Sequence, residues 1–289
     1  MHPADTAAMA WWVWPIALFA VTLLLGIVAV VAGIGGGVLF VPIVAGFFPF
    51  HLDFVRGAGL LLALSGTLAA GPVLLRSGIA NLRLAMPFAL TGSTASLAGA
   101  MVGLSAPANV LQIALGVIVI AVALLIWRVR PSQSSGIEES DPLGALLRLV
   151  GKFHDPAAGG HVDWRTNRTP AGLVVFAGIG FLGGVFGLGA GFANVPALNL
   201  LMGAPLKVAV GSSGLIISIV NSSAAWVYIN SGAVLPIIVV PSILGIMIGS
   251  RIGAALLRST PAETVRKLII VTMLLAGARA LLRGLSVWS

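Results

Sequence analysis

Ala32-Gly33-Ile34-Gly35-Gly36-Gly37-Val38 interrupts an apolar stretch of the chain that runs from Trp11 to Phe50. A similar run, Phe186-Gly187-Leu188-Gly189-Ala190-Gly191-Phe192, interrupts the apolar stretch from Pro170 to Ala204. A glycine in a helix interior costs about 1 kcal/mol relative to alanine, because its backbone loses more freedom on ordering. Neither run is therefore expected to continue a helix, and the two stretches predict two helices broken by glycines.

The composition around these runs places the chain in a membrane. Apolar residues make up 58% of the 289 positions and charged residues only 8%, whereas a soluble domain carries about 25% charged residues. One crossing needs about 20 apolar residues. Four uncharged stretches can each hold two crossings: Thr6 to Leu52, Leu84 to Trp127, Thr169 to Leu206 and Val208 to Ser250. The alternating pattern of a membrane barrel is absent, so an all-α, polytopic transmembrane helical bundle is predicted.

Other classes of protein are disfavoured by the charge and residue content. The net charge of +8 comes from basic residues at the ends of apolar runs, as the positive-inside rule requires, so nucleic-acid binding is not expected. The absence of cysteine excludes disulfides and thiolate metal sites. No Lys or Arg precedes the first apolar run, which favours a first transmembrane helix over a signal peptide. No nucleophile, base and metal ligands converge, so neither an enzyme nor a cofactor is expected.

The two glycine runs belong to a longer internal repeat. Gly33 to Ala123 aligns without a gap with Gly187 to Gly277. The alignment pairs residues with special backbone roles: Gly33 with Gly187, Gly35 with Gly189, Gly37 with Gly191, Pro42 with Pro196 and Pro107 with Pro261. Such self-similarity indicates a duplicated unit. Residues 1–127 are predicted to form a first transmembrane repeat, residues 128–169 a cytoplasmic linker, and residues 170–289 a second transmembrane repeat.

The predicted linker is polar and carries many basic residues. Within it, Asp141-Pro142 is expected to cap a short amphipathic helix. In that helix Leu143, Leu146, Leu147 and Val150 would face lipid, and Arg148 and Lys152 would face water. The linker also holds His154, Asp155, His161 and Asp163, whose spacing matches no standard metal site.

Two topologies are compatible with the repeat. Further spans are predicted at 57–75, 84–104 and 107–127, and at 208–229, 233–257 and 262–282. If each glycine-interrupted stretch crosses once, there are four spans per repeat and the repeats are parallel. If each crosses twice, or forms a re-entrant hairpin, there are five elements per repeat and the repeats are inverted. The inverted 5+5 arrangement, with the N-terminus outside, places more basic residues inside and is preferred over the 4+4 arrangement.

The glycine breaks are also the candidate binding site. A helix that restarts after a break points free N–H groups and the positive end of its dipole into the gap, which suits an anion. Two breaks could hold one anion between Gly35, Gly36, Gly37, Gly189, Ala190 and Gly191. Close helix packing through small residues is the alternative. Both runs are followed by Val-Pro, and this symmetry favours a site. A dinucleotide fingerprint is disfavoured, because the third glycine and the ribose-binding acid are missing.

Polar residues inside the predicted spans are few, and the second repeat holds most of them. The candidates for contacting an anion are Asn194, Ser212, Ser213 and Asn221. The first-repeat positions aligned with the last three are Ala58, Gly59 and Thr67, so specificity is expected to come from the second repeat. Hydrogen bonds between helices are the alternative role, at roughly 0.6–2 kcal/mol each.

Charged candidates lie near the ends of the predicted spans. Arg56 and Lys207, at the mouths of paired spans, are expected to attract anions, although a local ion pair with Asp53 is the plainer role for Arg56. Arg251 is expected to extend to the membrane interface. No Asp or Glu lies deep in a predicted span, so a buried carboxylate is not expected to carry a coupling proton.

The string from Gly33 to Pro42, GIGGGVLFVP, resembles the first-repeat signature of the TauE/SafE sulfite exporter family, also called the toluene sulfonate uptake permease family. Gly187 to Pro196, followed by Gly211-Ser212-Ser213, is similar to the second-repeat signature, and the resemblance covers nearly the whole chain. Ala190 stands where the family has a glycine, and the linker is long. The resemblance implies transport of sulfite, sulfoacetate and related sulfonates, or of other small sulfur and carboxylate anions.

Repeat, breaks and resemblance together predict a secondary membrane transporter, an exporter in the bacterial inner membrane, for small anions such as sulfite or C2–C3 organosulfonates. Its expected partners are the small anionic substrate and the lipid bilayer, without nucleic acid, metal or cofactor. A homodimer is one assembly open to such a protein. An anion channel and a transporter of small carboxylates remain alternatives.

Overall fold

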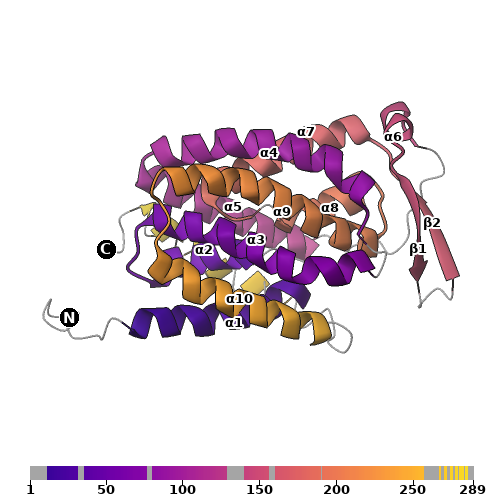
Figure 1. Cartoon of the computed structure of the whole chain (residues 1–289). Coiled ribbons are helices and arrows are strands. Elements are labelled where there is room, and N and C mark those ends of the chain that lie inside the picture. The colour runs from indigo at the N-terminus through magenta and orange to yellow at the C-terminus, as the bar shows by residue number, and fades with distance from the viewer. Residues whose placement is uncertain are drawn as a thin grey trace, which may run out of the picture.

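The structure, a computed structural model, describes residues 12–31, 36–76, 80–128, 140–155, 160–189 and 191–256, together with part of 267–285. The described residues form a bundle of helices lying side by side, and a β-hairpin projects from one end of it (Figure 1). The helices before the linker are α1 (Val13–Val31), α2 (Gly36–Phe47), α3 (Leu52–Arg76), α4 (Leu82–Ser105) and α5 (Ala108–Arg128). After the linker come α7 (Thr169–Phe186), α8 (Gly191–Pro196), the π-helix η1 (Ala197–Leu201), α9 (Leu206–Asn230) and α10 (Pro236–Leu256).

Several of these helices have the length and apolar character of membrane spans. Within the described residues, α3, α4, α7, α9 and α10 each contain a window that is long and apolar enough to cross a bilayer, and α1, α2 and α5 add shorter apolar stretches. The spans predicted at 57–75, 84–104, 107–127, 208–229 and 233–257 correspond to α3, α4, α5, α9 and α10. The predicted helical, multi-pass membrane protein is confirmed. The span predicted at 262–282 lies mostly outside the described residues.

Two pairs of parallel helices pack through glycines. α1 lies along α10, and α4 lies along α7. A Cβ atom on Gly249 of α10 would collide with the Leu23 carbonyl of α1, and one on Gly184 of α7 would collide with the Ser96 carbonyl of α4. Because small residues let helix backbones approach closely, these glycines have the packing role expected in membranes. They lie outside the two glycine runs.

Each glycine-interrupted segment begins and ends at the same end of the bundle. Trp14 near the start of α1 packs against Phe48 and Phe50 beyond α2, with ring centroids 5.6 and 6.0 Å apart. Beyond η1, the Met202 carbonyl accepts a hydrogen bond from the Asn167 amide, which precedes α7, at 3.0 Å. The end where α1 begins, here called the α1 end, lies opposite the hairpin end, where α7 begins (Figure 1).

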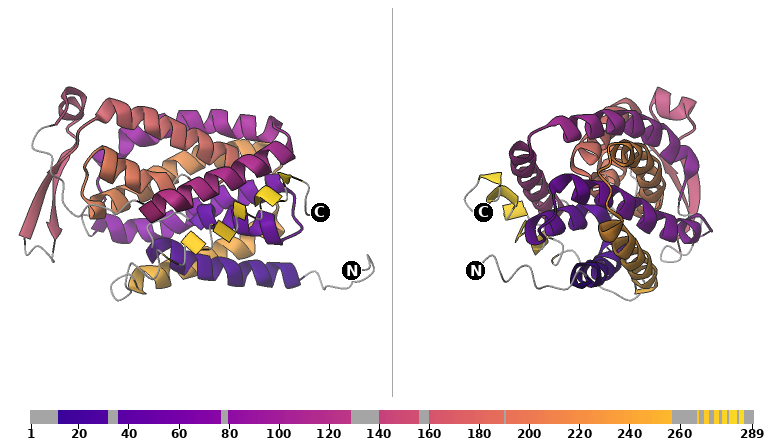
Figure 2. Two further views of the ribbon diagram at one scale, coloured as in Figure 1. Left: turned by 180° about the vertical axis from the view of Figure 1, so that it is seen from behind. Right: turned by 60° about the vertical axis from the view of Figure 1, so that its left-hand side comes forward.

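The linker differs from the prediction. Asp141 caps α6 (Pro142–Leu146), as predicted, by accepting a hydrogen bond from the Gly144 amide at 3.2 Å. The helix does not continue through Val150 and Lys152, and that part of the prediction was wrong, because Arg148 adopts a left-handed conformation with φ 52°. β1 (Val150–Asp155) and β2 (Gly160–Arg165) then form an antiparallel hairpin (Figure 2). Within the described residues, this hairpin is the exception to the predicted all-α fold.

The hairpin is anchored by a buried aromatic residue. Trp164 of β2 and Leu149 before β1 are almost fully buried in the apolar cluster that also contains Leu84 and Met202. A strand buries every second residue, and Trp164 and Thr166 are buried while Asp163 and Arg165 are exposed. Lys152 and Asp163, paired across the hairpin at 3.2 Å, point to the exposed side.

Candidate functional site

The second glycine run separates α7 from α8, and its residues Gly187 and Gly189 are buried inside the bundle. α7 ends at Phe186, and Gly187 and Gly189 adopt left-handed conformations with φ of 64° and 61°. α8 begins at Gly191, while Ala190 lies outside the described residues. A side chain at either left-handed position would be strained, so glycine is required for this path of the backbone.

The first glycine run meets the second one. α1 ends at Val31 and α2 begins at Gly36, while residues 32–35, Gly35 among them, lie outside the described residues. A Cβ atom on Gly37 would lie 2.7 Å from the carbonyl oxygens of Gly59 and Leu188. Leu188 belongs to the second run, so the first turn of α2 touches the second break directly.

Four buried polar side chains beyond the linker have no hydrogen-bond partner among the described residues: Asn194, Ser213, Asn221 and Ser242. Asn194 and Asn221 are 0% exposed and Ser213 is 1% exposed. The amide nitrogen of Asn221 lies 2.9 Å from the position of a Cβ atom on Gly189, so this side chain is directed at the break. Asn194 lies on α8, three residues beyond its start at Gly191. Each unpaired buried group costs about 1–3 kcal/mol, and a polar ligand would remove that cost.

Ser212, the remaining predicted polar residue, has a structural partner. Its hydroxyl accepts a hydrogen bond from the Asn81 amide at 3.0 Å and so joins the start of α9 to the segment before α4. Thr67 and Ser218 form a similar link between α3 and α9, with their hydroxyl oxygens 2.9 Å apart. Ser212 therefore has the alternative role that the sequence left open, a hydrogen bond between helices. No such bond is formed by Asn194, Ser213 or Asn221 within the described residues.

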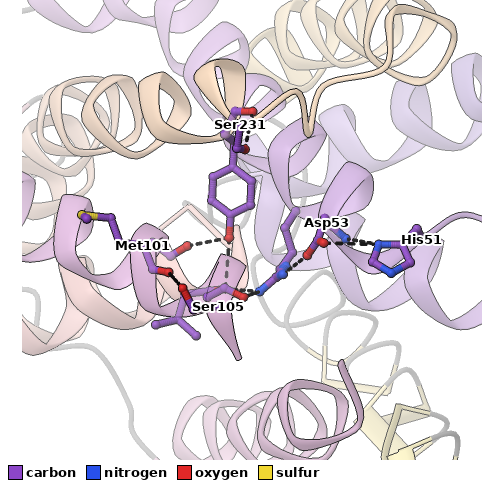
Figure 3. Close-up of polar contacts among 10 residues, drawn as sticks. His51, Asp53, Met101, Ser105 and Ser231 are labelled. Carbon is purple, nitrogen blue, oxygen red and sulfur yellow. Dashed lines mark hydrogen bonds and ion pairs between the residues drawn. The ribbon is translucent and has the colours of Figure 1, made fainter. Parts of the chain in front are cut away.

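Arg56 lies inside the bundle and not at its mouth, where the sequence placed it. Its side chain is 1% exposed. One terminal nitrogen donates to the carbonyls of Gly103 and Val185, both at 2.9 Å, and the other pairs with Asp53. The local ion pair is confirmed, whereas the predicted position just before a span was wrong, because α3 already begins at Leu52 and the Arg56 side chain is buried. Figure 3 shows Asp53 between His51 and the guanidinium group.

Tyr228 is a part of this cluster that the sequence analysis missed. The Arg56 Cζ atom lies 5.7 Å from the Tyr228 ring centroid. The Tyr228 hydroxyl donates to the carbonyls of Gly184 and Val185 at 3.1 and 3.3 Å. It is the only tyrosine of the chain and lies in a predicted span. A buried hydroxyl needs a partner, so this position carried a signal that could have been used.

The other charged candidates lie on the outside of the bundle. Lys207, on the first turn of α9, is exposed, and so are Arg83 and Arg251. Because α9 starts beside the Asn81 segment and ends beside Arg56, Lys207 and Arg56 lie at opposite ends of the bundle. Within the described part of the chain, no group of His, Asp and Glu side chains is arranged to hold a metal ion. The backbones of His154 and His161 are paired in the hairpin register.

A helical bundle with several helices long and apolar enough to cross a bilayer defines a multi-pass membrane protein. Residues 18–280 match the model of the family described as Sulfite exporter TauE/SafE, and the chain belongs to that family. The expected family is confirmed, and two relatives are named as probable membrane transporters.

Two relatives match over almost their entire length. The "Probable membrane transporter protein YunE" of Bacillus subtilis (strain 168) is 24% identical over 278 residues, which cover 93% of this chain and 97% of the relative. The "Probable membrane transporter protein ORF9" of Sinorhizobium sp is 25% identical over 268 residues, 91% of each chain. No solved structure matches this chain.

Proposed function

We propose that this protein is a secondary transporter that exports small anions, such as sulfite or C2–C3 organosulfonates, across a bacterial inner membrane. One observation carries the proposal: Asn194, Ser213 and Asn221 are buried without a partner in the part of the chain that the structure describes, and Asn221 faces the second glycine break. Amide and hydroxyl groups donate hydrogen bonds to oxyanions. The substrate is held between the two breaks, where the first turn of α2 adds the positive end of a helix dipole.

An inverted repeat gives this transporter its alternating access. The packing of α1 on α10 and of α7 on α4 supports this part of the proposal, because the repeat alignment exchanges one pair for the other. The opposite starting ends of α1 and α7 support it as well (Figure 1). The hairpin end faces the cytoplasm, since the linker carries Arg148, Lys152, Arg165 and Arg168. Residues 1–127 and 170–289 then act as the two repeats, rocking around the breaks.

Counterflow in liposomes tests the proposal. Purified protein is reconstituted into vesicles loaded with unlabelled sulfite, and the entry of labelled sulfite is followed, with taurine, isethionate and acetate as competitors. Saturable counterflow that a sulfonate inhibits is expected. A sulfite-dependent current without counterflow would point to a channel, and stronger inhibition by acetate would point to a carboxylate transporter. Absence of both flux and current for all these anions would contradict the proposal. Light scattering of the purified protein tests the homodimer, which stays a prediction.

A further inference from the structure

Arg56 joins four helices from both repeats at the α1 end of the bundle. Its backbone belongs to the first turns of α3, and its guanidinium group reaches the carbonyl of Gly103 on α4 and that of Val185 on α7. Tyr228 of α9 covers the same group. A motion that separates the two repeats at this end has to break these contacts.

The cluster of Asp53, Arg56 and Tyr228 also contacts the second glycine break. A Cβ atom on Gly187 would collide with the backbone of Arg56. Asp53, on the other side of the guanidinium group, is 29% exposed, and His51, 3.4 Å from its carboxylate, is 61% exposed. A line of contacts therefore runs from the exposed His51 through Asp53 to Arg56, and the Arg56 backbone touches Gly187 of the break. Figure 3 shows the first of these contacts, between His51 and Asp53.

Stability alone does not explain this ion pair. Taking charges out of water costs several kcal/mol each, and well-packed apolar residues often replace a buried pair without loss. The second repeat lacks the pair: its positions aligned with Asp53 and Arg56 are Lys207 and Val210. The Nε atom of Arg56 is buried without a partner among the described residues. The cluster thus occurs at the α1 end of the bundle, and the Nε–H group of Arg56 is left without an acceptor among the described residues.

We propose that Asp53 and Arg56 form a latch that the transported anion opens. Asp53 acts as a tethered anion that occupies the guanidinium group while no substrate is at this end. A carboxylate or sulfonate that reaches Arg56 presents the same pair of oxygen acceptors, to which guanidinium groups bind through two parallel hydrogen bonds. The substrate replaces Asp53, and the ends of α4 and α7 part from α3. This inference rests on the proposed function, because it needs a small anion as ligand.

Binding of labelled sulfite and of isethionate to the purified protein tests the competition. The Asp53→Asn variant keeps the shape of the side chain but removes the competing charge, so its Kd is expected to fall about tenfold. The Asp163→Asn variant removes the carboxylate of an exposed ion pair in the hairpin and serves as the matched control, with an unchanged Kd. The Arg56→Lys variant keeps the charge without the two-pronged geometry, and its Kd is expected to rise.

Opening can be followed by thiol labelling, because the chain contains no cysteine. Ala233 and Ala204 are buried residues in the segments after and before α9, at the α1 end and the hairpin end respectively. A membrane-impermeant thiol reagent should label the Ala233→Cys variant slowly. Labelling should be about tenfold faster when isethionate is added, or when the Ala233→Cys variant also carries Asp53→Asn. The labelling rate of the Ala204→Cys variant should not rise with Asp53→Asn.

The outcomes separate the latch from the proposed function. If the unmodified protein binds neither anion, the proposed function fails and the latch fails with it. If the protein binds anions but Asp53→Asn changes neither the Kd nor the labelling of Ala233→Cys, the proposed function stands and the latch is refuted. If Asp53→Asn only lowers thermal stability, with the Kd unchanged, the pair is a structural tie and the latch is refuted too.

Discussion

Arg56 and Tyr228 meet at one carbonyl: both side chains donate a hydrogen bond to the Val185 oxygen, and the Arg56 Cζ atom lies 5.7 Å from the tyrosine ring centroid. Val185 lies in the last turn of α7, where helix carbonyls lack partners within the helix. The two side chains thus complete the end of α7 just before the chain turns left-handed at Gly187. The path of the backbone into the break depends on residues from α3 and α9.

Removing the Tyr228 hydroxyl should loosen this arrangement without abolishing it. The Tyr228→Phe variant keeps the ring against Arg56 but loses the bonds to Gly184 and Val185, so it should cost about 1 kcal/mol. A drop of about 2 °C in Tm is expected for a chain of this size. The Tyr228→Leu variant also loses the contact between ring and guanidinium and should drop further. Equal Tm values for both variants and the unmodified protein would contradict this account.

The left-handed backbone at Gly187 predicts a sharp contrast between two glycines of the same segment. The Gly187→Ala variant combines a φ of 64° with a collision against the Arg56 backbone, and should lose about 2 kcal/mol or more. The Gly178→Ala variant, where a Cβ atom meets nothing within 4 Å, should keep or slightly raise the stability of α7. Thermal unfolding in detergent, followed by circular dichroism, measures both. A Gly187→Ala variant as stable as Gly178→Ala would show that the turn is misplaced.

Asn221 should trade stability for ligand binding. Its buried amide has no partner among the described residues, so the Asn221→Leu variant, of similar volume, should unfold at a Tm equal to or above that of the unmodified protein. The same variant should lose sulfite counterflow at least tenfold, because the ligand loses its donor. The Asn230→Ala variant, exposed at the end of the same helix, is the control and should keep full counterflow. Full counterflow by Asn221→Leu would remove this residue from the site.

Asp141 should fasten the linker to α7 in a pH-dependent way. Burial raises the pKa of its carboxyl group, but hydrogen bonds from the Thr169 side chain and from the Thr169 and Gly144 amides outweigh burial, and the pKa lies below its ordinary value of 3.8. A carboxyl group with a lowered pKa stabilises the folded state above that ordinary value and stops doing so as the pH falls through the folded-state pKa. The fastening should therefore be complete at neutral pH and weaken in strong acid.

Limited proteolysis of the linker measures this fastening. The Asp141→Asn variant should be cut faster at neutral pH, since losing this cap costs about 1 kcal/mol. An acid-active protease should cut the unmodified protein faster as the pH falls below about 4, while Asp141→Asn should show less of this dependence. The Asp163→Asn variant controls for general effects of a lost charge in the hairpin. Parallel pH profiles for Asp141→Asn and the unmodified protein would exclude this role for Asp141.

Part of the candidate site could be predicted from the sequence. The glycine run at residues 187–191, and Asn194, Ser213 and Asn221, were visible as exceptions in apolar spans, because glycine and amide residues are costly there. The roles of Ser212 and Arg56 were not predictable in the same way. Both side chains find partners far away in the chain, at Asn81 and at Gly103 and Val185. No local sequence pattern predicts such distant partners.

The amino-acid sequence by itself determined that this protein is a helical membrane protein with an internal repeat, a polar linker and two glycine runs. These features follow from composition and spacing, since apolar length and glycine content act locally on the backbone. The tertiary structure alone decided which buried polar groups of the described residues remain unpaired, and that Arg56 is held by the carbonyls of Gly103 and Val185. The reason is physical: hydrogen bonds and burial depend on which helices pack together, and that packing joins residues more than a hundred positions apart.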